Sequence, residues 1–197
     1  DTLKRLADLG CKTDYVQCDL SRPDTVREMM QSIAKRHPPV TGVIHGAGLL
    51  ADSNIAEKRA SDFADVVGVK SGSARLIEAA LDLSALRFWV SMSSIAAFLG
   101  NAAQTDYAAA SQDLVVQAYR LKALGVATVK AVLWGPWSGM GMVVDQDLEA
   151  RFAAAGVPLI GVEEGLEVNL LGLTFGIDPV DPALKLPIFG RLGPDRG

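Results

Sequence analysis

The 197-residue sequence contains only two histidines and two cysteines, and this scarcity excludes two classes of site. The histidines, His37 and His45, and the cysteines, Cys11 and Cys18, have no spacing that suits zinc, so we expect no metal site. The cysteines lie beside an expected strand, which is typical of small core residues in a reducing compartment and not of a disulfide framework. A cytoplasmic protein is therefore expected.

Long apolar runs and long basic runs are also lacking. Every apolar stretch is broken by Gly, Pro or a charge well before the roughly 18 residues that a membrane helix needs, and the N-terminus does not resemble a signal peptide. The 19 basic and 23 acidic residues give a net charge of -4, which gives no reason to expect nucleic acid. We therefore expect neither a membrane nor a nucleic-acid partner.

Segments typical of strands alternate with segments typical of helices. Strands are expected over residues 14–19, 40–45, 86–92 and 127–134, and helices over residues 22–36, 60–81 and 105–124. Near-continuous apolar strands separated by helices predict an α/β fold, with a doubly wound parallel sheet and helices on both faces. No linker interrupts the chain before residue 176, so we expect one domain over residues 1–176 and a C-terminal strand and tail over residues 177–197.

Four loops follow the expected strands at the sheet edge where ligands bind in such folds. They are residues 19–21, 45–48, 92–94 and 135–137. Gly46 and Gly48 would let the backbone approach a flat ligand closely, although a tight turn explains the same residues. His45 is expected to be a hydrogen-bonded core histidine.

Ser94 and Tyr107 suggest chemistry on a carbonyl group. A serine hydrolase needs a histidine base and a Gly-x-Ser-x-Gly turn, and the sequence around Ser94 has neither. A serine hydroxyl that holds a carbonyl oxygen, beside a tyrosine that supplies a proton, is instead typical of an oxidoreductase. A packed aromatic side chain is the alternative for a single tyrosine on a helix.

A phenol needs a nearby cation to exchange protons at neutral pH, because its ordinary pKa is about 10. Ser111, and no lysine, stands one helical turn after Tyr107. Lys70 is the only lysine in a stretch of small and apolar residues, but a solvated helix face explains it at least as well. Composition does not choose between Lys70 and three lysines that resemble surface residues, Lys58, Lys122 and Lys130.

Five segments together resemble one known family in their order and spacing. They are residues 42–48 (GVIHGAG), 69–72 (VKSG), 93–96 (SSIA), 104–110 (QTDYAAA) and 134–137 (WGPW). They are similar to the ketoreductase domain of type I polyketide synthases and polyunsaturated fatty acid synthases, in the short-chain dehydrogenase/reductase superfamily. The resemblance implies a Rossmann-like fold and NADPH-dependent reduction of a β-ketoacyl thioester to its β-hydroxyacyl form. It also implies two partners, an acyl carrier protein with its phosphopantetheine-tethered substrate and the other domains of the same megasynthase.

The resemblance implies roles for individual residues. Ser94 would hold the substrate carbonyl, Tyr107 would protonate it, and Lys70 would lower the Tyr107 pKa and touch the nicotinamide ribose. In the wider superfamily the lysine follows the tyrosine by four positions, whereas in these ketoreductases it comes from an earlier helix, as Lys70 does. The other residues implied for the cofactor are Asp19 and Leu20 at the adenine, His45, Gly46, Ala47 and Gly48 beneath it, and Gly135, Pro136 and Trp137 at the nicotinamide. Residues 138–144 would form the substrate lid.

Two features depart from the family pattern. Ser111 occupies a catalytic position at which these ketoreductases have an asparagine. Its shorter side chain lacks the amide that would hold the lysine or a relay water. Two sequence markers of product stereochemistry are incomplete. Residues 50–52 keep one of the two aspartates typical of ketoreductases that form one product configuration, and Leu99 stands where a tryptophan marks those that form the opposite configuration. Activity and product configuration are therefore left open, as are acyl chain length, substrate identity and oligomeric state.

The beginning of the sequence also differs from the family. The chain starts at Asp1 in what resembles a later helix, and no Gly-x-Gly-x-x-Gly turn follows a strand. We expect a fragment of a larger polypeptide without the N-terminal pyrophosphate site, inactive and weak in NADPH binding on its own. Two alternatives stay open: a catalytically silent domain that positions its neighbours, and a free-standing short-chain reductase of small ketones.

Overall fold

The computed structural model describes residues 2–138, 150, 152, 154 and 157–167. Its centre is a parallel sheet of three strands in the order β1-β2-β3, formed by Gly42–His45, Phe88–Ser94 and Thr128–Trp134. Ile44 pairs with Val90, which pairs with Lys130. Because all three strands run the same way, the loops that follow them emerge at one edge of the sheet.

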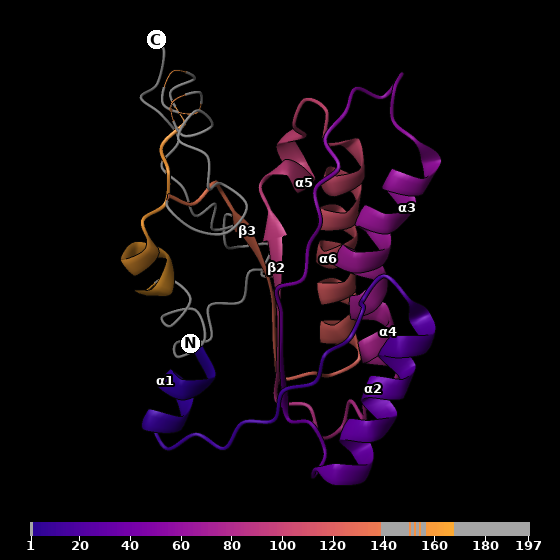
Figure 1. Cartoon of the computed structure of the whole chain (residues 1–197), viewed down its shortest axis with the longest axis vertical. Coiled ribbons are helices and arrows are strands. Elements are labelled where there is room, and N and C mark those ends of the chain that lie inside the picture. The colour runs from indigo at the N-terminus through magenta and orange to yellow at the C-terminus, as the bar shows by residue number, and fades with distance from the viewer. Residues whose placement is uncertain (1, 139–149, 151, 153, 155–156, 168–197) are drawn as a thin grey trace.

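Most helices cover one face of this sheet (Figure 1). On that side lie α2 (Pro23–Arg36), α3 (Ala60–Val67), the π-helical turn η1 (Gly68–Gly72), α4 (Ser73–Ala79) and α6 (Thr105–Ala123). The short α5 (Ala96–Leu99) follows β2, and α1 (Thr2–Asp8) lies on the opposite side of the sheet, as does a helical turn at residues 162–167. Among the described residues, no helix is both long and apolar enough to cross a membrane.

The two faces of the sheet bury different side chains. Trp89 of β2 is fully buried beneath α6, where its indole N–H donates to the Ser91 hydroxyl at 2.8 Å. Val90 and Met92 point the other way and pack with Val132, Trp134 and Ile160. This alternation follows from the period of two along a strand, and it confirms the expected α/β fold with a covered parallel sheet.

Helix α6 carries the longest buried stripe. Ala110, Leu114, Ala118 and Leu121 recur at helical spacing and are all buried against the sheet. The helix ends one residue before the predicted end, and its first turn begins at Thr105 as predicted. Because the stripe fixes the rotation of α6, it also fixes the direction in which Tyr107 points.

Residues 14–19 do not form the predicted strand. A strand needs a neighbour for its backbone N–H and C=O groups, and among the described residues β1 pairs with β2 alone. The segment is instead tied to α2, because the Asp14 carboxylate accepts hydrogen bonds from Arg36 at 2.5 Å and from His37 at 2.8 Å. The predicted core position of the cysteines is wrong for the same reason: Cys11 is exposed and Cys18 is half-buried.

Other predictions need smaller corrections. The helix predicted over residues 60–81 is continuous in space but is divided by η1 into α3 and α4. The strands begin one or two residues later than predicted, and β2 extends to Ser94. The C-terminal strand and tail at 177–197, and the lid residues after Ser138, lie outside the described residues.

Candidate active site

Ser94 and Tyr107 meet at the carboxyl edge of the sheet. Ser94 is the last residue of β2, and Tyr107 lies in the first turn of α6. Burial raises the pKa of Tyr107 above its ordinary value, a hydrogen bond with Ser94 opposes this, and the charge of Asp52 adds to it. The phenol is therefore protonated at neutral pH and has a hydroxyl partner, as a proton donor requires.

The cation beside Tyr107 is Lys70. Its side chain is buried, with only 2% of the residue exposed, and its Nζ lies 4.5 Å from the centroid of the Tyr107 ring. The ammonium also donates a hydrogen bond to the Met92 carbonyl oxygen at 3.1 Å. Burial lowers the pKa of Lys70 to about 8, so the group still carries its charge at neutral pH. Of the four lysines considered, Lys70 is thus placed with its ammonium over the Tyr107 ring.

The direction of the Tyr107 pKa differs from the lowering that the resemblance implied. The ammonium lies over the face of the aromatic ring, and its hydrogen bond goes to the Met92 carbonyl. Burial of the phenol, together with the charge of Asp52, therefore outweighs the hydrogen bond with Ser94 and raises the Tyr107 pKa. The site consequently holds the tyrosine in its proton-donating form.

A π-helical turn presents Lys70 to this site. In η1 the Ser73 N–H bonds to the Gly68 carbonyl, five residues back, which inserts an extra residue relative to an α-helix. Small residues surround the lysine in sequence, and a Cβ at Gly72 would lie only 3.4 Å from the Val67 carbonyl oxygen. Single π turns occur frequently at functional sites because they redirect one side chain without ending the helix.

Ser111 lies one turn beyond Tyr107 and is completely buried. Its carbonyl oxygen accepts a hydrogen bond from the Ser93 hydroxyl at 2.8 Å, which ties α6 to β2. Within the described part of the chain, its own Oγ has no hydrogen-bond partner. The backbone of Ser111 therefore has a clear structural role, whereas its hydroxyl does not reach Lys70.

His45 closes β1 next to Lys70. Its Nε2 lies 2.9 Å from the Ser73 Oγ, which in turn donates to the Val69 carbonyl at 2.6 Å. Since the serine proton is used, Nε2 must carry the imidazole hydrogen and Nδ1 must be the acceptor. Burial, aided by the charge of Lys70, lowers the pKa of His45 to about 4, so the ring is neutral. His45 is hydrogen-bonded and buried, as predicted, and its Nδ1 has no donor among the described residues.

The remaining predicted cofactor residues occupy loops at the same edge. Gly46, Ala47 and Gly48 follow β1, and Gly135, Pro136 and Trp137 follow β3. The Trp137 ring packs edge-on against Trp134, with 4.6 Å between the ring centroids. This contact gives the loop after β3 a fixed position beside the sheet.

Asp19 forms a local turn before α2. Its carboxylate accepts hydrogen bonds from the Ser21 N–H at 3.0 Å and the Ser21 hydroxyl at 2.7 Å, and these bonds lower the Asp19 pKa. The turn approaches the helix that carries Lys70, since a Cβ at Gly68 would lie 3.9 Å from the Ser21 carbonyl oxygen. Leu20 lies within this turn, so both residues border the site without joining the Tyr107 cluster.

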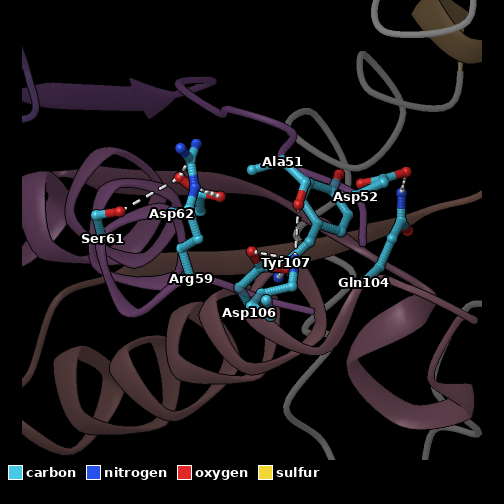
Figure 2. Close-up of polar contacts among 9 residues, drawn as sticks. Ala51, Asp52, Arg59, Ser61, Asp62, Gln104, Asp106 and Tyr107 are labelled. Atoms are coloured by element: carbon cyan, nitrogen blue, oxygen red, sulfur yellow. Dashed lines mark hydrogen bonds and ion pairs between the residues drawn. The ribbon is translucent and has the colours of Figure 1, made fainter. Parts of the chain in front are cut away.

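Two contacts near Tyr107 have no counterpart among the sequence predictions (Figure 2). The Gln104 amide donates to the Asp52 carboxylate at 2.8 Å. Lys58 forms a buried ion pair with Asp106, although the sequence suggested a surface lysine. Lys130 is likewise buried, in β3. The pairs join residues about fifty positions apart, and no local pattern encodes such a distance.

The family is identified by comparison with known proteins. The KR domain family model matches residues 1–139. This chain belongs to the KR domain family. It is 33% identical over 174 residues to a polyunsaturated fatty acid synthase protein of Thraustochytrium sp. and 34% identical over 172 residues to the polyketide synthase PksN of Bacillus subtilis. These alignments cover 88% and 84% of the chain but only 6% and 3% of those proteins.

Solved KR domains have the same fold. A ketoreductase domain from the bacillaene assembly line superposes with a TM-score of 0.75 at 26% identity, and the first ketoreductase of the tylosin polyketide synthase with 0.74 at 29%. Each match covers 88% of this KR chain, and 43% and 37% of those chains. A short-chain dehydrogenase from Burkholderia cenocepacia in complex with NADP shares the fold at 17% identity, with a TM-score of 0.70. The Rossmann-like fold and the resemblance to polyketide and fatty acid synthase ketoreductases are confirmed.

Proposed function

We propose that this chain carries the acid-base site of an NADPH-dependent ketoreductase, which reduces a β-ketoacyl thioester on an acyl carrier protein to the β-hydroxyacyl form. The observation that carries the proposal is the position of Lys70 Nζ, 4.5 Å from the Tyr107 ring centroid, with Ser94 hydrogen-bonded to the phenol. A buried cation, a protonated phenol and a second hydroxyl at one sheet edge suit reduction of a carbonyl. Membership of the KR family supports the same reaction.

Each of the three side chains has a distinct part in this chemistry. The Ser94 Oγ would donate a hydrogen bond to the substrate carbonyl oxygen and hold it near Tyr107. The Tyr107 Oη would give its proton to that oxygen as the carbonyl carbon is reduced. Lys70 would then stabilise the phenolate, because a cation close to the ring favours the charged form. NADPH, when bound, supplies the hydride that reduces the carbon.

The residues present fit a nicotinamide cofactor. The buried His45 Nδ1 is an acceptor without a donor among the described residues, and Lys70 uses one of its three N–H groups for Met92. Both groups offer polar contacts to a ligand at the edge of the sheet. The loops 46–48 and 135–137, together with Asp19 and Leu20, would complete the binding surface. In open α/β sheets, ligands bind at this edge.

The expected partners follow from the relatives. The curated relatives are large synthases, of which this chain matches a small part. We therefore propose that the other domains of the same megasynthase, and an acyl carrier protein with its phosphopantetheine-tethered substrate, are the partners. A free-standing reductase of small ketones fits these relatives less well.

A catalytically silent KR domain is the second candidate. One observation favours it: the Ser111 Oγ has no partner in the described part of the chain and stands where active relatives are expected to have an amide. Such a domain would retain the fold and position its neighbours. It would not reduce a ketone.

Activity of the full-length protein separates the two candidates. NADPH oxidation would be followed with a β-ketoacyl thioester, in the unmutated protein and in the Tyr107→Phe and Lys70→Ala variants. The proposed reaction requires reduction by the unmutated protein and its loss in both variants. Reduction at near parental rates in both variants would reject the site, and no reduction in any protein would favour the silent domain.

A further inference from the structure

A single buried ammonium joins the loop after β1 to the first turn of α6. Lys58 Nζ donates to the Ala51 carbonyl oxygen and to Asp106 Oδ2, each at 2.7 Å. The Lys58 side chain is only 5% exposed and that of Asp106 is fully buried. Both charges are thus removed from water, and each depends on the other for compensation.

The same carboxylate also contacts Tyr107. Asp106 Oδ1 accepts a hydrogen bond from the Tyr107 backbone N–H at 2.9 Å. The backbone of Ala51 and the backbone of Tyr107 are therefore connected through two side chains, Lys58 and Asp106. Figure 2 shows Ala51 close to Asp106 and Tyr107. Movement of the Ala51 backbone would therefore shift the Tyr107 backbone, and movement of Tyr107 would shift Ala51.

Two further hydrogen bonds hold the same pair of segments together. The Ser53 N–H donates to the Ala103 carbonyl at 3.0 Å, and the Gln104 amide donates to Asp52 at 2.8 Å. Ala103 has a φ of 66°, a left-handed conformation that no other non-glycine residue adopts among those described. Such a conformation persists only where its surroundings hold it, and it is frequent at functional sites.

We propose that Lys58 is a positioning residue for the reduction, which fixes the loop segment 51–53 against the start of α6 and so sets the orientation of Tyr107. The inference rests on the proposed function. Lys58 reaches neither substrate nor cofactor in this role, because its contacts are Ala51 and Asp106. The loop segment also carries Asp52, so the lysine holds a carboxylate near the phenol as well as a backbone.

A double variant separates positioning from stability. Lys58→Met alone leaves the Asp106 carboxylate buried without its cation, so loss of stability is expected whatever its catalytic role. In Lys58→Met/Asp106→Asn the charges are removed together and stability should recover, but the Ala51 carbonyl is still released. The matched control is Arg59→Met, which breaks the ion pair between the exposed Arg59, next to Lys58 in sequence, and the half-buried Asp62.

The measurement is steady-state reduction by the full-length protein, together with thermal melting and hydrogen exchange of residues 49–54. For the double variant we expect a melting temperature close to the parent, faster exchange in the loop, and a fall in kcat of about tenfold or more with a smaller change in KM. Arg59→Met should match the parent in melting temperature, in hydrogen exchange of the loop and in kcat.

The possible outcomes separate this inference from the proposed function. A double variant with parental stability, parental exchange and kcat within about twofold of the parent would overturn the inference and leave the proposed function intact. If the unmutated protein reduces no thioester, the proposed function fails and Lys58 has no catalytic role. Loop exchange would then decide whether the lysine holds the segment at all.

Discussion

Lys70 and Tyr107 come from different helices, and the lysine ammonium lies 4.5 Å from the centroid of the tyrosine ring. A lysine one turn after the tyrosine would share its helix, but here Ser111 takes that place and the cation is supplied by the π-helical turn η1. The arrangement ties the acid-base pair to the packing of η1 against α6. Any change in that packing would alter the distance between the cation and the phenol.

Removal of the Tyr107 hydroxyl should abolish reduction without unfolding the domain. Tyr107→Phe keeps the ring that packs beneath Lys70 but removes the proton donor, and loss of a general acid typically costs about 10²–10⁴-fold in rate. We expect kcat/KM to fall by at least about 100-fold in the full-length protein, with circular dichroism and melting temperature near those of the parent. A rate within a factor of a few of the parent would assign the proton to another group.

The buried charge of Lys70 should reduce the stability of the folded protein. Its pKa is lowered from 10.5 to about 8 by burial, so the folded state disfavours the charged form. Below pH 8 both folded and unfolded chains carry the charge and the cost is present in full. Between pH 8 and 10.5 the unfolded chain binds more protons, so stability rises with pH in this window.

Lys70→Met should therefore increase the free energy of unfolding at pH 7 by about 3–4 kcal/mol, since the pKa is lowered from 10.5 to about 8 and each pKa unit is worth about 1.4 kcal/mol. The gain should shrink as the pH approaches 10.5, because the parent loses the buried charge there. Urea unfolding of parent and variant at pH 7 and pH 10 measures both values. An equal difference at the two pH values would contradict the assigned pKa, and the variant should have lost reduction whatever its stability.

Local sequence patterns predicted the parts of this site that lie on regular elements. The helix predicted over residues 105–124 contains Tyr107 as α6 does, whereas Ser94 was expected in the loop after a strand and is instead the last residue of β2. Lys58 could not be located in this way, since its burial depends on Asp106, which lies on another element far along the chain. The π turn was missed for a related reason: one extra residue in a helix leaves no mark in hydrophobic periodicity. The strand predicted at 14–19 had the right composition, but within the described part of the chain no strand pairs with it.

Ser111 tests whether an unpartnered hydroxyl takes part in the reaction. Its Oγ is buried and has no hydrogen-bond partner among the described residues, and a buried unsatisfied group costs about 1–3 kcal/mol. We expect Ser111→Ala to be equal to the parent in stability or up to about 1 kcal/mol more stable, because the backbone bond from Ser93 is retained. The variant should reduce the thioester within about threefold of the parental rate. A loss of tenfold or more would show that the hydroxyl serves the proton path, for example through a water.

Asp52 should influence the proton affinity of Tyr107 from the loop. Among the described residues, the charged groups near Tyr107 include Lys70 on η1, Asp52 on the loop after β1, and Asp106, which pairs with Lys58 and accepts the Tyr107 backbone N–H. The Asp52 carboxylate disfavours a phenolate and so raises the Tyr107 pKa. Asp52→Asn removes this charge while it retains an oxygen that can accept the Gln104 hydrogen bond.

The expected result is a lower Tyr107 pKa in Asp52→Asn, with burial still keeping it above the ordinary range. Tyrosine labelled with ¹³C in the ring reports the titration by NMR, and the Tyr107 signal is the one that disappears in Tyr107→Phe. Asp62→Asn is the matched control, because Asp62 is engaged by the exposed Arg59 and carries the same charge change. An unchanged or higher Tyr107 pKa in Asp52→Asn would mean that the loop does not hold its carboxylate near the phenol. The Lys58→Met/Asp106→Asn variant extends this test. If Lys58 fixes the loop that carries Asp52, this variant should also lower the Tyr107 pKa; if it does not, the Tyr107 pKa should stay at the parental value.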